Sequence, residues 1–155
     1  MLQNSILTPK EALNVSKLLW SNDYSVNIIS IDNEHKLLVE LINEFDSALD
    51  IHGAFQTKIV IVTLNKLALY IRRHFESEER FLQLNSYPDY NEHKQDHDLL
   101  LDRLSQFERN FLTAKQSFNE EMLLFLKDWL VRHIILHDHK FGEYYRDKDL
   151  INHFD

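Results

Sequence analysis

Apolar residues recur along most of this chain at the three- and four-residue spacing of an amphipathic helix. Three stretches with this pattern span about residues 31–51, 56–84 and 89–114, and a fourth begins at Ser117. The segments between them are short, so consecutive helices should pack antiparallel. The pattern predicts an all-α fold, specifically an antiparallel up-down-up-down four-helix bundle.

An N-terminal arm precedes the first of these stretches. Thr8-Pro9-Lys10-Glu11 combines an N-cap residue, a proline at the first helical position and an acidic residue in the first turn. A short helix should therefore run to about Leu19, and residues 20–30 should form an extended connector. We accordingly divide the chain into an arm, residues 1–29, and a bundle, residues 30–155.

Composition narrows the class of protein. The 155 residues include only two Gly and two Pro, which favours one domain built from long helices over a turn-rich β fold. The absence of cysteine excludes disulfides, thiolate metal sites and thiol catalysis. A net charge of −8 without a basic run argues against partners such as nucleic acid or an anionic membrane. With no secretory signal and no apolar segment of membrane-spanning length, we expect a cytoplasmic protein.

Histidine lies in phase with the apolar face of every predicted bundle helix. The residues concerned, with one carboxylate, are His35, His74, Glu78, His93, His97 and His133. His74 and Glu78 are four residues apart, so they share one helix face, and the same holds for the pair His93 and His97. Burying so many polar groups in one layer is costly unless they have partners, and metal ions would be such partners.

The metal itself is left open by residue types alone. Imidazole and carboxylate together suit iron, zinc, copper or manganese. One tetrahedral zinc takes about four ligands, and this layer offers more, so two metals bridged by carboxylates are predicted. Any one of these pairs alone is more often ordinary surface histidine. Histidines in phase with the apolar face on four successive helices are hard to explain without metal, because a metal-free bundle would leave these buried polar groups without partners.

The position that follows His133 is ambiguous. His137 is four residues along and shares its helix face, whereas Asp138 is five along and lies roughly 140° away on an ideal helix. Spacing alone favours His137. Asp138 could face the layer only if the helix ended or widened locally.

At these residues the sequence resembles the hemerythrin family, in particular its single-domain bacterial members. The resemblance covers about residues 20–145. It is carried by Trp20, Tyr24-Ser25-Val26, Ile31 to Leu38, His74 to Glu79, Tyr87-Pro88, His93 to His97, and Trp129 to Ile134 with Asp138.

The resemblance implies two irons joined by an oxo or hydroxo bridge. By position, His93, His97 and His133 would bind one iron, and His35 and His74 the other. Glu78 and Asp138 would bridge both irons, which favours Asp138 over His137. The iron with two histidines then has one ligand fewer and keeps an open position.

The function implied is reversible O2 binding for storage, delivery or sensing, without enzymatic turnover. O2 would bind at the open position in an apolar pocket. Candidate lining residues are Leu130, Ile134, Phe75 and Ile71, although ordinary core packing explains Ile71 and Ile134 at least as well. We expect a monomer, with an O2-consuming enzyme as a candidate partner.

The alternative function is a di-iron enzyme acting on peroxide or NO. Ferritin-like di-iron enzymes use mostly carboxylates, with Glu-x-x-His on two helices, and that motif is absent from this sequence. Binding is therefore preferred to catalysis. His52, His137, His139 and His153 have no assigned role and are interpreted as surface histidines.

Overall fold

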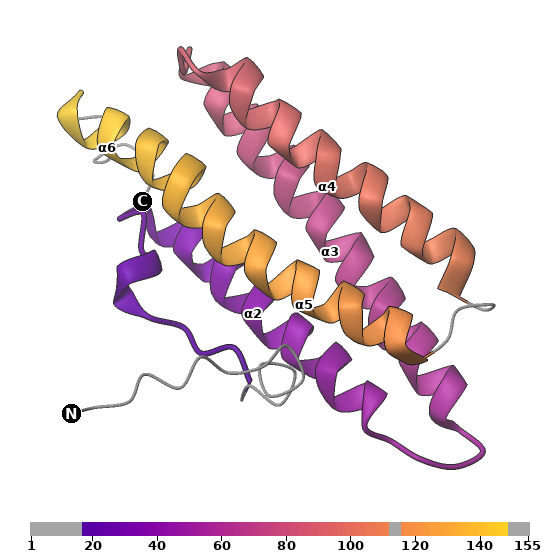
Figure 1. Ribbon diagram of the computed structural model, residues 1–155. Coiled ribbons are helices and arrows are strands. Elements are labelled where there is room, and N and C mark those ends of the chain that lie inside the picture. The colour runs from indigo at the N-terminus through magenta and orange to yellow at the C-terminus, as the bar shows by residue number, and fades with distance from the viewer. Residues whose placement is uncertain (1–16, 112–115, 149–155) are drawn as a thin grey trace, which may run out of the picture.

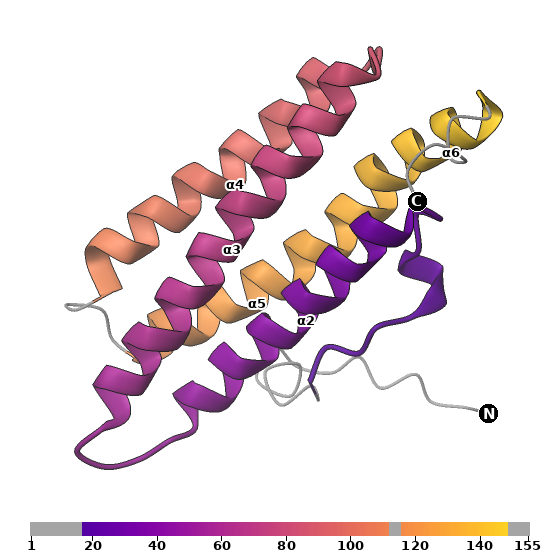
Figure 2. The same ribbon diagram turned by 180° about the vertical axis from the view of Figure 1, so that it is seen from behind.

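Four long helices lie side by side along most of the chain (Figures 1 and 2). The computed structural model describes residues 17–111 and 116–148. The helices are α2 (Ile29–Leu49), α3 (Gln56–Leu84), α4 (Tyr90–Asn110) and α5 (Gln116–His133). Consecutive helices run in opposite directions, which confirms the predicted up-down-up-down bundle. The predicted bounds agree to within two residues for α2, α3 and the start of α4 and α5.

The last helix of the bundle changes its winding partway along. After His133 the chain forms a π-helix, η3 (Ile134–Asp138), and then continues as α6 (His139–Asp147). The backbone N–H of His139 donates to the carbonyl of Ile134, five residues back rather than four. Single π turns inside α-helices are rare and often occur at functional sites.

The core follows the apolar stripes that the sequence predicts. Leu38, Leu41, Ile42, Phe45 and Leu49 of α2 are all buried, as are Val60, Leu64, Leu67 and Ile71 of α3, Leu100, Leu104 and Phe107 of α4, and Met122, Leu126 and Leu130 of α5. Phe45 and Phe107 meet edge to face, with ring centres 6.3 Å apart, and so join α2 to α4 across the bundle. Burial of these stripes fixes which face of each helix points inward.

The described part of the arm runs along α2. The side-chain amide of Asn43 accepts from the Leu18 backbone N–H at 2.9 Å and donates to the Leu18 carbonyl at 2.8 Å. Nearer the bundle, one oxygen of the buried Asp32 accepts from the Val26 N–H at 2.8 Å, and the other accepts from the Ser25 hydroxyl at 2.6 Å. These bonds hold the connector against the first turn of α2.

The arm differs from the prediction in two details. The connector is not wholly extended, because Ser21 caps a turn of 3-10 helix, η1 (Asn22–Tyr24). The short helix predicted from Thr8 lies outside the described residues, apart from 17–19, which are not helical. Among the residues that the structure does describe, every helix is too short or too polar to cross a membrane.

Candidate metal centre

Seven polar side chains meet inside the bundle, and each is at most 3% exposed. They are His35 of α2, His74 and Glu78 of α3, His93 and His97 of α4, His133 of α5 and Asp138 of η3. These are the seven residues that the sequence and the resemblance together point to. Two side chains four residues apart on one helix point the same way, which places the α3 and α4 pairs.

Asp138 reaches this group because the helix widens after His133. With hydrogen bonds that span five residues, Asp138 returns to the helix face of His133, and its Oδ1 lies 2.9 Å from His133 Nε2. His137 points elsewhere and its side chain is 19% exposed. The expectation from ideal helix spacing, that His137 would face the layer, is wrong because that spacing assumes an unbroken α-helix.

The Glu78 carboxylate lies between two groups of histidines. Its Oε1 is 2.5 Å from His93 Nε2 and 3.5 Å from His97 Nε2. Its Oε2 is 3.2 Å from His74 Nε2 and 3.8 Å from His35 Nε2. One oxygen therefore faces the α4 histidines, and the other faces the histidines of α2 and α3.

Asp138 has the same two-sided arrangement from the opposite element. Its Oδ1 approaches His133 and lies 3.4 Å from His93 Nε2, while its Oδ2 lies 3.1 Å from His35 Nε2. Each carboxylate thus has one oxygen beside two of the histidines of α4 and α5, and its other oxygen beside one or both of the histidines of α2 and α3. This is the arrangement needed by a carboxylate that bridges two metal ions.

The buried donor atoms are poorly satisfied by one another. Both ring nitrogens of His35, Glu78 Oε2 and both oxygens of Asp138 lack a hydrogen bond. The Nε2 atoms of His97 and His133 face each other at 3.0 Å. Buried polar groups normally have partners, and two adjacent ligands of one metal at about 2.1 Å lie about 3 Å apart. The donor set therefore fits metal ions of the kinds that bind imidazole and carboxylate together.

Three of the histidines have a carboxylate at Nδ1, the ring nitrogen that faces away from the centre. Glu34 Oε2 lies 2.5 Å from His74 Nδ1, Glu79 Oε1 lies 3.0 Å from His97 Nδ1, and Asp96 Oδ2 lies 2.6 Å from His133 Nδ1. A carboxylate at Nδ1 fixes the imidazole ring and leaves Nε2 free to bind metal.

These supporting carboxylates were not found by sequence reasoning. A signal was present, since Glu34 and Asp96 directly precede His35 and His97, and Glu79 directly follows Glu78. A neighbouring position is turned about 100° round the helix. Each carboxylate therefore faces the adjacent helix and reaches a histidine there.

The pKa values of the buried histidines and carboxylates are set by two opposing effects, burial and the proximity of opposite charge. Burial alone would lower the pKa of His35, but the carboxylates of Asp138 and Glu78 raise it to about 9. Burial would also raise the pKa of Glu78, but hydrogen bonds from the surrounding histidines hold it well below its usual range. Without metal, the carboxylates are charged and His35 carries a proton that a metal ion would have to displace.

Two of the three histidines of the α4–α5 side have pKa values that are shifted in opposite directions. The pKa of His133, which burial would lower, is raised to about 9 by Asp138 and Asp96. Burial lowers the pKa of His97 to about 4, although its hydrogen bond to Glu79 opposes the shift. His97 is therefore neutral at physiological pH, whereas His133 would have to lose a proton before it could bind a metal ion.

Two aromatic side chains, Phe75 and Trp129, pack against the histidines of this group. Leu130, Ile134, Phe75 and Ile71, the predicted pocket residues, are all buried. The Phe75 ring stacks on His97, with centres 3.6 Å apart and 4° between planes, and Trp129 stacks on His133 at 4.5 Å. Phe75 also lies 5.8 Å from the ring of His74. These contacts exclude water from the histidines.

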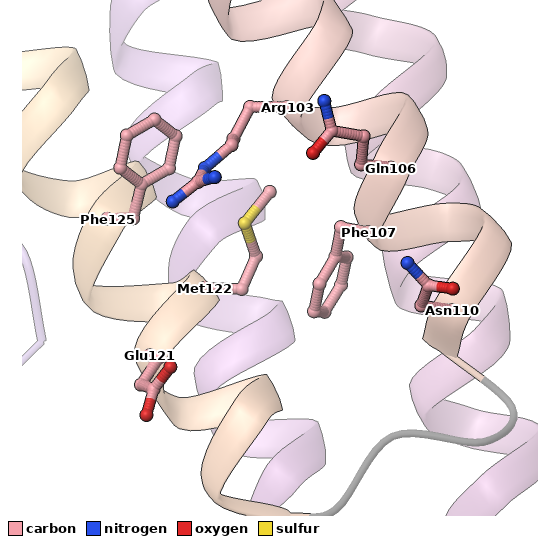
Figure 3. Close-up of a pocket in the computed structure, with 7 residues that line it drawn as sticks. All are labelled: Arg103, Gln106, Phe107, Asn110, Glu121, Met122 and Phe125. Carbon is pink, nitrogen blue, oxygen red and sulfur yellow. The ribbon is translucent and has the colours of Figure 1, made fainter.

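A separate cavity of about 180 Å³ opens between α4 and α5 (Figure 3). In that view Phe107 and Met122 point toward each other, and the Arg103 side chain extends toward Phe125. Phe107 is ten residues beyond His97, about 15 Å along the helix. This cavity is therefore distinct from the centre.

The remaining histidines lie away from the centre or at its edge. His52 is exposed in the turn between α2 and α3, and His139 is partly buried. His137 lies at the rim, where its ring stacks on His133 with centres 5.2 Å apart. His153 lies outside the described residues.

Comparisons with known proteins match this geometry. A family model described as the hemerythrin HHE cation binding domain matches residues 27–145. A bacteriohemerythrin of Pseudomonas aeruginosa is 31% identical over 123 residues, which is 77% of this chain and 76% of that protein. One of Methylococcus capsulatus is 28% identical over 120 residues, 77% of this chain and 89% of that protein. A crystal structure of wild-type hemerythrin superposes with a TM-score of 0.73 at 25% identity, covering 83% of this chain and 97% of that one.

Proposed function

The chain belongs to the hemerythrin family, and from that premise we propose that it binds O2 reversibly at a centre of two iron ions joined by an oxo or hydroxo bridge. The observation that carries the proposal is the position of Glu78 and Asp138. Each carboxylate has one oxygen beside either histidine group, at 2.5–3.8 Å from the ring nitrogens. A single ion would leave one oxygen of each carboxylate and at least two histidines unused.

The proposed ligand sets are unequal. One iron would take His93, His97 and His133, and the other would take His35 and His74. Glu78 and Asp138 would bind both. With the bridge included, the first iron has six ligands and the second has five, so one position remains open for O2 beside the histidines of α2 and α3.

The two irons would supply two electrons to O2 on binding and recover them on its release. The chain's own part is to hold the ligands and keep water out. Glu34 orients the ring of His74 on the side with the open position. Leu130, Ile134, Phe75 and Ile71 are buried apolar residues around the centre, and we propose that they line the O2 pocket. An apolar lining withholds the protons that would turn reversible binding into irreversible reduction.

Binding is proposed in preference to catalysis for a structural reason. Seven protein ligands, all at most 3% exposed, would leave the iron pair a single open position, which O2 itself would occupy. We further propose that the protein is a cytoplasmic monomer. The physiological use of the bound O2, which includes delivery to an O2-consuming enzyme, is also part of the proposal. So is the division into an arm, residues 1–29, and an iron-binding bundle, residues 30–155.

The test is to load the metal-free protein anaerobically with Fe²⁺, count the iron and cycle O2 while recording the visible spectrum. Two irons per chain and a charge-transfer band that appears with O2 and disappears under argon are expected. Steady consumption of O2, or a band that forms once and does not reverse, would contradict the carrier function and favour the enzyme.

Two variants test the bridge assignment. Asp138→Ala should lose iron, because it removes a ligand to both ions, whereas His137→Ala should still reach two irons per chain at equilibrium. If His137→Ala loses iron and Asp138→Ala keeps it, the proposed ligand set is incorrect.

A further inference from the structure

Asp96 and His137 form a second group of metal-binding atoms at the edge of the centre. Asp96 Oδ2 lies 3.9 Å from His137 Nε2 and 2.6 Å from His133 Nδ1. The donor atoms of Asp96, His133 and His137 all lie within 4.8 Å of one another, close enough to surround one ion. The seven proposed iron ligands do not include Asp96 or His137.

Exposure decreases in steps from this edge to the centre. The side chains of Asp96 and His137 are 27% and 19% exposed, whereas those of His133 and Asp138 are 1% and 0% exposed. His133 has Nδ1 toward Asp96 and Nε2 toward Asp138, at 2.9 Å. An ion held by Asp96 would therefore be separated from the centre by the width of one imidazole ring.

The centre itself is closed, so iron must enter past a partly exposed side chain. Three partly exposed carboxylates contact the proposed ligand histidines at Nδ1. They differ in the side chain that lies next to the carboxylate on its solvent side. Glu79 has the ammonium of Lys94 at 3.5 Å, which repels a cation. Glu34 has the Ser77 hydroxyl at 3.5 Å, a weak metal ligand. Among the described contacts, Asp96 alone of these three has a second imidazole in reach, that of His137, and imidazole suits Fe²⁺ and Zn²⁺.

We propose that Asp96 and His137 form an entry site, which takes a divalent transition-metal ion from solvent before the ion passes His133 into the di-iron centre. The inference rests on the proposed function, because it supplies that centre. Asp96 contributes a carboxylate oxygen, His137 contributes Nε2, and water completes the shell. Transfer then requires the His133 ring to swing from Asp96 toward the ion, which exchanges a hydrogen bond for a metal bond.

The local charge supports capture of a cation. Asp96 faces the rings of His133 and His137, and the chain as a whole carries a net charge of −8. A net negative charge raises the local concentration of cations around the protein.

Substitution of His137 by Phe is the sharpest test, because a phenyl ring keeps the stack on His133 and removes the metal-binding nitrogen. Two measurements are made on whole protein. Calorimetric titration with Zn²⁺ of protein that already holds two irons should show a third ion bound, and His137→Phe should weaken its affinity by roughly 10- to 100-fold. Stopped-flow addition of Fe²⁺ to metal-free protein should show slower loading of His137→Phe, with the same final two irons and the same O2-dependent band. His52→Ala, which removes an exposed histidine far from the site, should match the unaltered chain in both.

The entry site is overturned if the unaltered chain binds no third ion, or if His137→Phe loads iron at the unaltered rate. Failure of the proposed function would look different, since the unaltered chain would then take up no iron pair or show no reversible band. That result would remove the entry site as well, because it would have nothing to supply.

Discussion

At the scale of single residues, Glu34 shows how a side chain that touches no metal can control one. It lies 28% exposed at the surface of α2, yet its carboxylate is 2.5 Å from Nδ1 of the buried His74. A carboxylate in this position fixes the ring and makes the other nitrogen a stronger ligand. His74 is one of only two histidines proposed for the iron with the open position. A weaker bond from His74 should therefore lower the affinity of the protein for that iron.

Glu34→Gln should therefore weaken iron retention by roughly 10- to 100-fold, the usual effect of removing such a partner. Competition with a chelator, followed by iron analysis, measures the loss. Glu44→Gln is the matched control, because Glu44 lies on the same helix and pairs only with Lys66 at the surface among the described contacts. Equal iron retention in the two variants would show that the Glu34 contact does not support the site.

Six of the seven residues of the centre could be predicted because each is in phase with the apolar stripe of its own helix, whereas Asp138 was indicated only by the family resemblance. His74 with Glu78 and His93 with His97 are four apart and in register with the core stripe. The three supporting carboxylates could not be predicted in the same way, because each contact crosses between helices and depends on their relative rotation. Asp96 is an example, since its partner His133 is 37 residues away in sequence.

At the scale of elements, the π-helix η3 decides which residue after His133 enters the centre. A π turn can be regarded as one residue inserted into an α-helix. Sequence spacing that assumes an unbroken α-helix therefore assigns every later residue to the wrong helix face. In this chain the inserted residue brings Asp138 inward and leaves Leu136, which is 57% exposed, outside. The resemblance to a family identified Asp138 where helix periodicity could not.

Deletion of Leu136 should be tolerated, because it returns η3 to an α-helix with the aspartate four residues after His133. The buried residues of α6, such as Phe141, would keep their positions. Circular dichroism and iron analysis should show a folded chain that still binds iron. Deletion of the exposed Glu40 within α2 is the control, and it should abolish folding by rotating Leu41 and Phe45 out of the core. Loss of the fold in both deletions would refute this account of η3.

The arm and α6 approach each other too closely for a side chain at position 142. A Cβ atom on Gly142 would lie 2.5 Å from the backbone oxygen of Val26 and 3.2 Å from its Cβ. Gly142→Ala should therefore push the connector away from α6 and lower the free energy of unfolding by about 1–3 kcal/mol. Urea unfolding measures the change, and the exposed neighbour Glu143→Ala should have little effect. An unchanged midpoint for Gly142→Ala would mean that the arm is not pressed against α6.

At the scale of the whole molecule, the bundle holds a layer of ionisable histidines and carboxylates inside an apolar core. When no metal is present, the contribution of this layer to the free energy of unfolding depends on pH. His35 and His133 have pKa values raised from 6.5 to about 9. Their contribution to stability is present below about pH 6.5 and is lost as the pH rises through 9. The pKa of His97 is lowered from 6.5 to about 4, so its contribution is present above pH 6.5 and is lost as the pH falls through 4.

The melting temperature of the metal-free protein should therefore be highest near neutral pH and fall on both sides. The fall on the acid side should steepen below about pH 4.5, because the unfolded chain then binds protons that Glu78 and Asp138, with their lowered pKa values, do not bind in the folded bundle. Iron bound as proposed would replace the protons of His35 and His133, so the iron-loaded protein should lose the alkaline decline while keeping the acid one. Thermal unfolding of both forms between about pH 3 and pH 10 makes the comparison, with about pH 6.5 to 9 as the decisive interval for His35 and His133. A metal-free protein whose melting temperature stays level across that interval would show that these two histidines do not carry protons in the folded bundle.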